Sequence, residues 1–206
     1  RTNSISQKNF RYVELDLSDV DAVAQWQFPE LKNPSRIFLV NNAGAIGHVK
    51  PVGAIDNASF QRLFNVNLTA PCILTNNFIK TYGDKNVPLV IMNISSGASK
   101  NPIDGWSSYC ASKAGLEMFS RVVAEELSIS GKKHVRIFSI APGIVDTAMQ
   151  DEIRRASSKD FSRIQQFVDY KITEQLAHPD LTAKKLLSTL DLPEKFPETV
   201  FSAKDL

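Results

Sequence analysis

The chain has 206 residues, of which 43% are hydrophobic and 22% are charged, and its formal net charge is +2. This size is enough to bury one core, and so small a net charge argues against nucleic acid or an anionic membrane as a partner. No apolar run approaches the roughly 20 residues that span a bilayer. The two cysteines, Cys72 and Cys110, are too few for a disulfide framework. We therefore expect a protein of a reducing compartment, the cytoplasm, without nucleic-acid or membrane partners.

Apolar strands and amphipathic helices alternate along the chain. The alternating pattern of Phe10–Ser18 predicts a strand. Continuous apolar runs are typical of parallel strands that are buried on both faces, and they occur at 36–40, 88–95 and 134–141. A last short strand is expected in the tail, residues 196–206.

Helical patterns lie between these predicted strands. A short helix is expected after Ser18 or Asp19, since either residue can cap it. Three longer helical patterns follow, at 57–82, 106–130 and, with breaks, 149–190. The first of these is expected to kink near Pro71. Strands alternating with helices predict an α/β fold, in which helices cover both faces of a parallel sheet.

Polar residues stand where the predicted strands end. These residues are Asp16, Asn41, the pair Ser95 and Ser96, and Pro142 with its following glycine. Parallel sheets of this kind bind ligands at the carboxyl ends of their strands. Four such strand ends together predict a ligand site at this edge of the sheet.

The segment "GWSSYCASKAG" places Tyr109 and Lys113 four residues apart, on one face of the predicted helix. A free tyrosine, with a pKa of about 10, is a poor acid at neutral pH, and a nearby ammonium lowers that pKa. Tyr109 would then protonate a developing alkoxide, and Ser95 or Ser96 would donate a hydrogen bond to the same oxygen. The same spacing is also common on helices without a site, so the interpretation depends on its context.

The context is "NNAG" upstream, a serine thirteen residues before Tyr109, and "APG" after the next strand. With these motifs the chain resembles the short-chain dehydrogenase/reductase family from "ELDLSD" to "APGIVDTAM". The resemblance implies one Rossmann-type domain over 1–206, a doubly wound parallel sheet that binds a nicotinamide cofactor. It implies that Ser96, rather than Ser95, orients the carbonyl and that Tyr109 is the general acid. Lys113 would lower the tyrosine's pKa and hold the nicotinamide ribose.

Further contacts follow from the same resemblance. Asn67 in "NVNLT" matches the residue that holds a water in the proton relay. Arg1 lies where NADPH-dependent members carry a basic residue that binds the ribose 2′-phosphate. NADPH is therefore the expected cofactor. The expected cofactor contacts are Arg1, Asp16, Leu17, Asn41, Ala43, Gly44, Tyr109, Lys113, Pro142, Gly143, Val145 and Thr147.

Several of these positions also have an ordinary structural interpretation. Asp16 could cap the helix that follows it, Asn67 could satisfy carbonyls at a helix kink, and Pro142 with Gly143 could form a simple turn. No metal is expected, because none of the three histidines has a metal-binding spacing.

The family's glycine-rich loop, T-G-x-x-x-G-I-G, is not found before Asp16. In the family this loop brings the backbone close to the cofactor's pyrophosphate. The first strand, first helix and second strand of the fold are unmatched as well. We therefore expect that this N-terminal βαβ portion is missing from the sequence and that the whole protein has about 240–250 residues.

Within the family, the segments around Tyr109 and Met149 most resemble sepiapterin reductases and benzil reductases. Trp106 is then expected to form an aromatic wall and Met149 an apolar wall for a planar dicarbonyl, although Trp106 could also simply anchor the helix start. Sepiapterin reductases hold the pterin with an aspartate near the C-terminus, where this chain has Ser202 and, out of register, Asp205.

The expected activity is therefore that of an NADPH-dependent carbonyl reductase acting on a ketone or dicarbonyl such as sepiapterin or benzil. The alternatives are a non-catalytic NADP(H)-binding sensor or scaffold, or a family member with another substrate class, ketoacyl or alcohol. Residues 149–176 are expected to form a mobile substrate lid, or else a solvated helix pair. The family also implies a homodimer or homotetramer, with Leu116, Phe119 and Val123 either in that interface or in the core.

Overall fold

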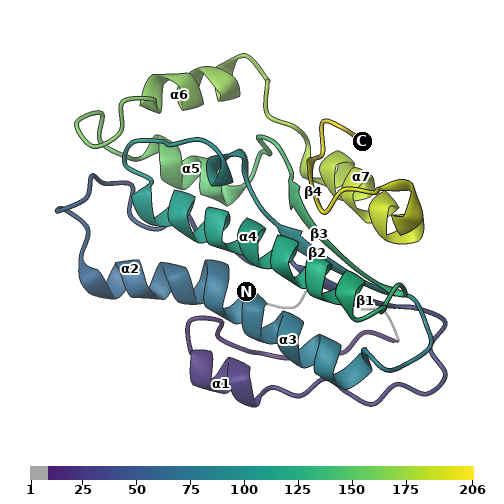
Figure 1. The fold of residues 1–206 in the computed structure, drawn as a ribbon. Helices are drawn as coiled ribbons and strands as arrows, with labels where there is room; N and C mark the ends of the chain where they lie inside the picture. The colour runs from purple at the N-terminus through teal and green to yellow at the C-terminus, as the bar shows by residue number, and fades with distance from the viewer. Residues whose placement is uncertain (1–8) are drawn as a thin grey trace.

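The computed structural model describes residues 9–206, which form a parallel sheet in the order β1-β2-β3-β4 (Figure 1). The strands are β1 (Ile37–Asn41), β2 (Leu89–Ile94), β3 (Val135–Ala141) and β4 (Val200–Ser202). The α-helices are α1 (Val20–Gln25), α2 (Asn57–Phe64), α3 (Ala70–Tyr82), α4 (Ser107–Ile129), α5 (Ala148–Arg154), α6 (Ile164–Ile172) and α7 (Pro179–Asp191).

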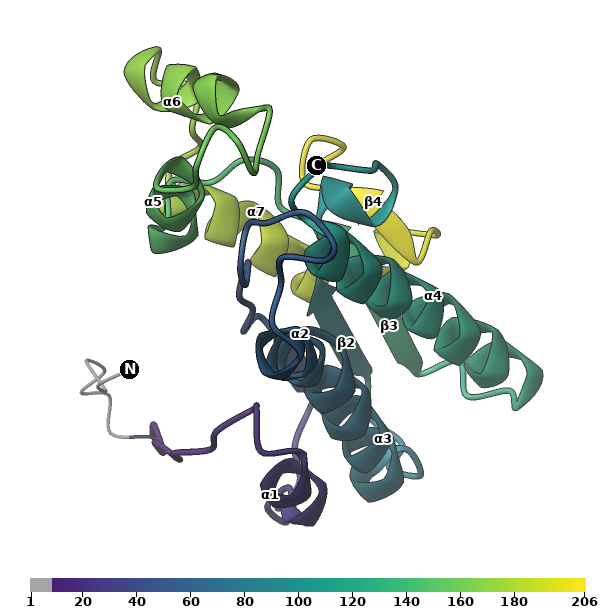
Figure 2. The same cartoon turned by 90° about the vertical axis from the view of Figure 1, so that its left-hand side faces the viewer.

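Alternate residues of the central strands face different layers of helices. Leu89 and Ile91 of β2 pack in one apolar cluster with residues of α3 and α4, while Val90 and Met92 pack in another with residues of α7. Figure 2 shows α3 and α4 on one side of the sheet and α7 on the other. The predicted α/β fold with both faces covered is thus confirmed. None of the described helices has the length and apolar character needed to cross a membrane.

The prediction of a strand over Phe10–Ser18 is wrong. Within the described residues, this segment pairs with no strand of the sheet. Alternating side chains favour an extended chain, but a strand also requires a neighbour that completes its ladder of hydrogen bonds. The end of the segment is instead attached to the helical layer, because the side chain of Asn65 donates to the carbonyl of Ser18 at 3.0 Å. Asp19, rather than Ser18, caps α1 through the backbone N–H of Ala22.

The helical pattern of 57–82 forms one run with a distortion in its middle, close to the predicted kink. A π-helical turn, Asn65–Thr69, separates α2 from α3 and ends shortly before Pro71. A π-turn widens the helix locally and changes the direction of the side chains that it carries. Asn67, in the centre of this turn, is thereby buried against the sheet edge.

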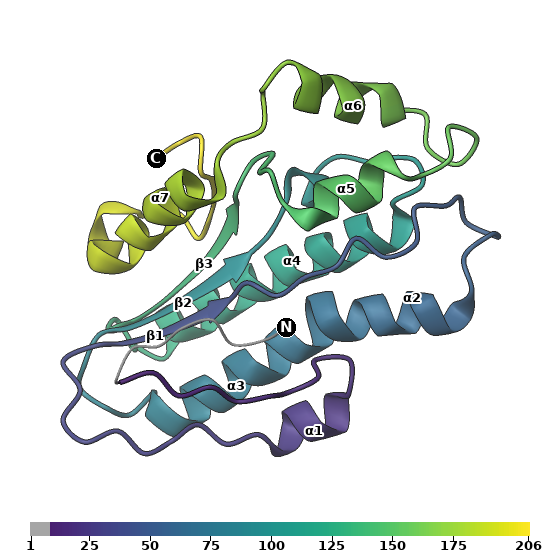
Figure 3. The same ribbon diagram turned by 180° about the vertical axis from the view of Figure 1, so that it is seen from behind.

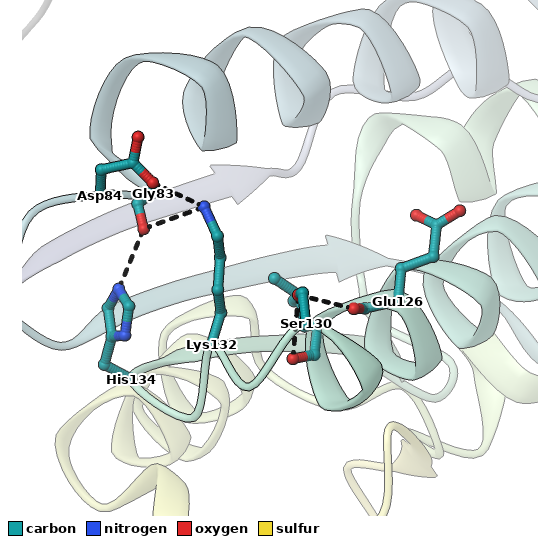
Figure 4. Close-up of polar contacts among 7 residues, drawn as sticks. Gly83, Asp84, Glu126, Ser130, Lys132 and His134 are labelled. Carbon is teal, nitrogen blue, oxygen red and sulfur yellow. Dashed lines mark hydrogen bonds and ion pairs between the residues drawn. The ribbon is translucent and has the colours of Figure 1, made fainter.

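At the opposite end of the sheet, where β2 and β3 begin, hydrogen bonds connect the end of α3 to the residues just before β3. The carbonyl of Gly83 accepts hydrogen bonds from Lys132 Nζ at 3.4 Å and from His134 Nε2 at 3.1 Å, and Lys132 also pairs with Asp84 at 2.7 Å (Figure 4). Helix ends leave carbonyls without intrahelical partners. These bonds satisfy one of them and join α3 to the turn between α4 and β3.

A buried polar network joins β1, β2, α3 and α4. The side-chain nitrogen of Asn41 donates to Asn93 Oδ1 at 2.8 Å and to Thr75 Oγ1 at 3.2 Å. Asn93, which is completely buried, donates in turn to Ser120 Oγ at 2.9 Å. Asn41 thus links β1 to both β2 and α3.

Replacing Asn93 by alanine should lower the free energy of unfolding by about 2–4 kcal/mol, because it removes the buried acceptor of the Asn41 amide and the buried donor to the Ser120 hydroxyl. Urea titration followed by circular dichroism measures this change. Asn76→Ala, at an exposed position of α3, is the matched control and should cost less than about 0.5 kcal/mol. Equal losses for the two variants would contradict the importance of the network.

Candidate active site

The candidate site lies where the carboxyl ends of β1, β2 and β3 meet the first turns of α4. Figure 3 shows this end of the sheet beneath α5 and α6. Tyr109 and Lys113 stand one turn apart in α4 and are only 6% and 4% exposed. The ammonium of Lys113 is 5.8 Å from the centre of the Tyr109 ring. The fold thus brings together the two side chains that the sequence singled out, in an interior from which water is largely excluded.

Ser96 is the serine of the pair that reaches Tyr109. Its side chain is close enough to the phenol to lower the pKa of that group, and its hydroxyl accepts from the backbone N–H of Ala98 at 3.1 Å. The neighbouring Ser95 is buried, and its hydroxyl has no hydrogen-bond partner among residues 9–206. The geometry therefore agrees with the choice of Ser96 over Ser95.

The pKa of Tyr109 departs from the expectation. Burial of the phenol raises this pKa, and the nearby Ser96 hydroxyl offsets only part of the rise. The expected lowering by Lys113 is not found in this structure, because removing a phenolate from water costs more than the surrounding contacts return. At neutral pH the phenol therefore keeps its proton, as a proton donor must.

Lys113 is held by the strand end beneath it. Its Nζ donates to the carbonyl of Ile94 at 2.8 Å. Burial lowers the pKa of Lys113 from 10.5 to about 8, since few groups nearby replace the water that would solvate an ammonium. The amine therefore titrates close to neutral pH.

Both the oxygen and the nitrogen of the Asn67 side-chain amide form hydrogen bonds. Its Oδ1 accepts from the backbone N–H of Ala45 at 2.9 Å, and its Nδ2 donates to the carbonyl of Ala45 at 2.8 Å and to Ser112 Oγ at 3.3 Å. Gly44 lies between this amide and the lysine: a Cβ there would be 3.5 Å from Asn67 Oδ1 and 3.5 Å from Lys113 Nζ. A methyl group at this position would be in van der Waals contact with both polar groups.

The segment after β3 is attached to the loop before α7. Val145 pairs with Ala177 in an isolated parallel bridge, and Asp146 N donates to Ala177 O at 3.0 Å. Gly143 adopts a φ of +84°, which favours glycine, and nothing lies within 4 Å of the place where a Cβ would stand. Thr147 is the N-cap residue of α5, but its side chain makes no capping hydrogen bond, so its hydroxyl is not used by the helix.

The remaining predicted cofactor positions are less closely gathered. Asp16 is exposed, and its carboxylate accepts from the backbone N–H and the hydroxyl of Ser18, both at 2.8 Å; these bonds lower its pKa. Leu17 is half-buried, and Ala43 is exposed beside Gly44. Arg1 lies outside the described residues.

Trp106 and Tyr109 belong to an aromatic cluster that the sequence revealed only in part. The Trp106 ring stands edge-on to Tyr109 at 5.5 Å, stacks on Phe161 at 5.5 Å and contacts Phe167 at 5.4 Å. Met149 is half-buried and packs against this cluster. Phe161 and Phe167 were missed because they lie in a polar segment whose only signal was these isolated aromatic residues.

The residues present fit the nicotinamide end of a dinucleotide. The buried amine of Lys113 donates to a single protein acceptor among the described contacts. No side chain occupies the position of Gly44 beside it, and the hydroxyl of Thr147 makes no hydrogen bond to the start of α5. Ribose hydroxyls and a carboxamide are ligands that such groups bind. Within residues 9–206, no group of three or more His, Cys, Asp or Glu side chains is placed to hold a metal ion.

A parallel sheet with helices on both faces, and with a buried Tyr–Lys pair and a half-buried serine at its strand ends, defines a class of nucleotide-dependent oxidoreductases. The family model of the short chain dehydrogenases matches residues 2–158, and the chain belongs to this family. It is therefore an oxidoreductase acting on a carbonyl or hydroxyl group of a small molecule, and the family uses NAD(P) as cofactor.

Two individual relatives have names that state a substrate. The chain is 38% identical over 196 residues to the benzil reductase ((S)-benzoin forming) of Bacillus cereus, which covers 92% of this chain and 78% of that protein. It is 32% identical over 165 residues to the sepiapterin reductase of Bos taurus, which covers 79% of this chain and 60% of that protein.

Two solved structures share the fold. The KRED1-Pglu enzyme has a TM-score of 0.70 at 27% identity, over 86% of this chain and 72% of that one. A metagenomic short-chain oxidoreductase in complex with NADP has a TM-score of 0.53 at 34% identity, over 65% of this chain and 58% of that one.

The depressed pKa of Lys113 predicts how stability changes with pH. Between its folded value of about 8 and its unfolded value of 10.5, the unfolded state binds more protons at this site, so the free energy of unfolding rises with pH. Lys113→Met removes this dependence. In the cofactor-free protein, the stability of wild type relative to Lys113→Met should therefore increase by about 2 kcal/mol from pH 7.5 to 10.

Urea unfolding at a series of pH values measures this difference. Lys100→Met, which removes a lysine that is exposed to solvent, is the control and should follow wild type. A constant difference between wild type and Lys113→Met across this range would show that the amine is not desolvated.

Proposed function

We propose that this enzyme reduces dicarbonyl compounds of the benzil type with NADPH, using Ser96, Tyr109, Lys113 and Asn67 as its catalytic residues. The observation that carries the proposal is the buried Tyr109, with the Lys113 ammonium 5.8 Å from its ring centre and the Ser96 hydroxyl close enough to lower the pKa of the phenol. A proton donor and a hydrogen-bond donor directed at one oxygen are what the reduction of a carbonyl requires.

The bound nicotinamide supplies the hydride. Ser96 positions the substrate oxygen by a hydrogen bond, and Tyr109 gives its proton to that oxygen as negative charge develops there. Lys113 compensates the charge left on the phenolate and binds the ribose. Asn67, held by Ala45, is the group that would keep a water in position to return a proton to the site.

The cofactor contacts expected from the family are part of the proposal. Gly44, Pro142, Gly143, Val145 and Thr147 would surround the nicotinamide and its ribose, and Asn41 and Ala43 the strand end beside them. Asp16 and Leu17 would contact the adenine. NADPH is preferred to NADH because Arg1 could bind the ribose 2′-phosphate and because the structure of a relative at 34% identity was determined with NADP.

Benzil-type substrates are favoured over pterins by the walls of the site. Trp106 and Met149 would contact a flat aromatic dicarbonyl, as the 38% identity to a benzil reductase also suggests. Trp106 is 6% exposed and its indole N–H has no partner among the described residues, which suits the second carbonyl of a dicarbonyl. Sepiapterin is the second candidate, supported by the relative from Bos taurus; Asp205, however, folds back to accept from Ser202 N at 2.9 Å.

Assembly and location are also proposed. Leu116 and Val123 are buried and Phe119 is half-buried in the chain's own core, so a homodimer or homotetramer would use the exposed Met118 and Val122 of α4 instead. Both cysteines are free thiols, which agrees with a cytoplasmic enzyme. Residues 149–176 would form its substrate lid.

Tyr109→Phe should reduce kcat for benzil at least about 100-fold, because it removes the general acid. NADPH binding, measured by the fluorescence of the bound cofactor, should change little, since the phenol hydroxyl contributes little to holding it. Tyr82→Phe is the matched control: this buried tyrosine donates to Pro29 O far from the site and should leave kcat near wild type. Loss of NADPH binding together with turnover would contradict the assigned role.

Substrate preference is tested by the loss of NADPH absorbance with benzil, sepiapterin and the monoketone deoxybenzoin. Benzil should be reduced with the highest kcat/KM, and Trp106→Phe should lower this value about 10-fold for benzil but less for deoxybenzoin, because a hydrogen bond to the second carbonyl is lost. Faster turnover of sepiapterin would favour the pterin alternative. No turnover of any of the three would overturn the proposed substrate class.

A further inference from the structure

Three consecutive residues before α4 contact three consecutive residues of the segment between α5 and α6. The carboxylate of Asp104 accepts from Ser162 N at 2.6 Å and from Ser162 Oγ at 2.9 Å. Trp106 stacks on Phe161, with ring centres 5.5 Å apart and planes inclined by 22°. The two segments are more than fifty residues apart in sequence, so tertiary structure alone brings them together.

Gly105, between these two contacts, allows the close approach. Its φ is +71°, and a Cβ on it would stand 2.7 Å from the carbonyl oxygen of Asp160. A side chain is thus excluded both by the backbone conformation and by the neighbouring chain. The carbonyl of Gly105 accepts from Lys50 N at 3.0 Å, so the loop after β1 also contacts this glycine.

The contact leads directly to the active site. Asp104 is five residues before Tyr109, and Trp106 stands edge-on to the Tyr109 ring at 5.5 Å. Phe161 is completely buried against Trp106. Any displacement of Ser162 from Asp104 would therefore move Phe161, and with it the support of the Trp106 ring that stands beside Tyr109.

We propose that Asp104 is a positioning residue: its paired bonds to Ser162 dock the α5–α6 segment (residues 148–172) and thereby hold Phe161 behind Trp106, the aromatic wall proposed for the substrate. The role rests on the proposed reduction of flat dicarbonyls, for which this wall matters. A carboxylate that accepts from a backbone N–H and a hydroxyl of one residue holds both the position and the orientation of that residue. Arg163 adds a weaker bond to Pro102 O at 3.4 Å.

Asp104 touches neither the phenol nor the amine of the site in any described contact, so its loss should weaken substrate binding more than it slows the chemical step. Removal of the docking bonds should let the α5–α6 segment open more often. Opening would raise KM, whereas kcat would stay similar, or rise if product release limits turnover. A role in the reaction itself would lower kcat instead.

The first test uses Trp106 as a reporter in a Trp26→Phe background, since the chain has two tryptophans. Asp104→Ala should increase acrylamide quenching of Trp106 roughly twofold, whereas Ser162→Ala, which keeps the backbone bond, and Asp104→Asn, which keeps one acceptor oxygen, should increase it by less. Asp169→Asn is the matched control, because this carboxylate of α6 accepts from Gln165 of its own helix. Quenching equal to that of the control in both alanine variants would overturn the proposal.

The second test measures benzil reduction. Asp104→Ala should raise KM roughly 5- to 20-fold with kcat within about threefold of the parent, Ser162→Ala should raise KM by less, and the double variant should be no worse than Asp104→Ala alone. Additive losses, or a loss confined to kcat, would contradict docking through this pair. If the parent protein does not reduce benzil, the proposed function fails, while the quenching experiment still decides whether Asp104 docks the segment.

Discussion

The site depends on how α4 is held against β2. Two hydrogen bonds determine this position: Asn93 donates to Ser120, and Lys113 donates to the carbonyl of Ile94. The two helical residues are seven positions apart, which is two turns on the same face, and the two strand residues are neighbours. Because both bonds lie in an apolar interior, sliding α4 along the strand would leave several buried polar groups without partners, a cost that apolar packing alone would not impose. The helix that carries Tyr109 therefore has one register.

Burial acts on the two titratable groups of the site in the same sense. It lowers the pKa of the lysine and raises that of the tyrosine, so both groups are shifted toward their uncharged forms. At neutral pH the phenol is uncharged, whereas a lysine with a pKa of about 8 still carries its proton in most molecules. When reactants occupy the space, the ammonium and the hydrogen-bond donors would act in a medium of low polarity, where such interactions are strong.

Periodic features of the fold could be predicted from the sequence, whereas features created by tertiary contacts could not. The apolar runs of β1, β2 and β3 and the long pattern of α4 locate the sheet, its layers and the pair Tyr109–Lys113, because each signal lies within a few residues. The strand expected at Phe10–Ser18 failed, since pairing depends on a neighbour. The pKa direction of Tyr109 was also wrong, because a spacing of four residues conveys the nearby charge but not the depth of burial. The bond between Asp104 and Ser162 joins two polar loops and leaves no pattern in either.

The π-helical turn at Asn65–Thr69 determines how this long helix could tolerate a change in length. An insertion or deletion inside an ordinary α-helix rotates everything beyond it by about 100° per residue. A π-turn already contains one residue more than an α-turn would, so removing a single residue here could be absorbed within the turn. Phe78 and Tyr82 would then keep their places against the sheet, while the amide that now meets Ala45 would point elsewhere. The packing of the helical layer and the geometry of the site are thus separable at this one turn.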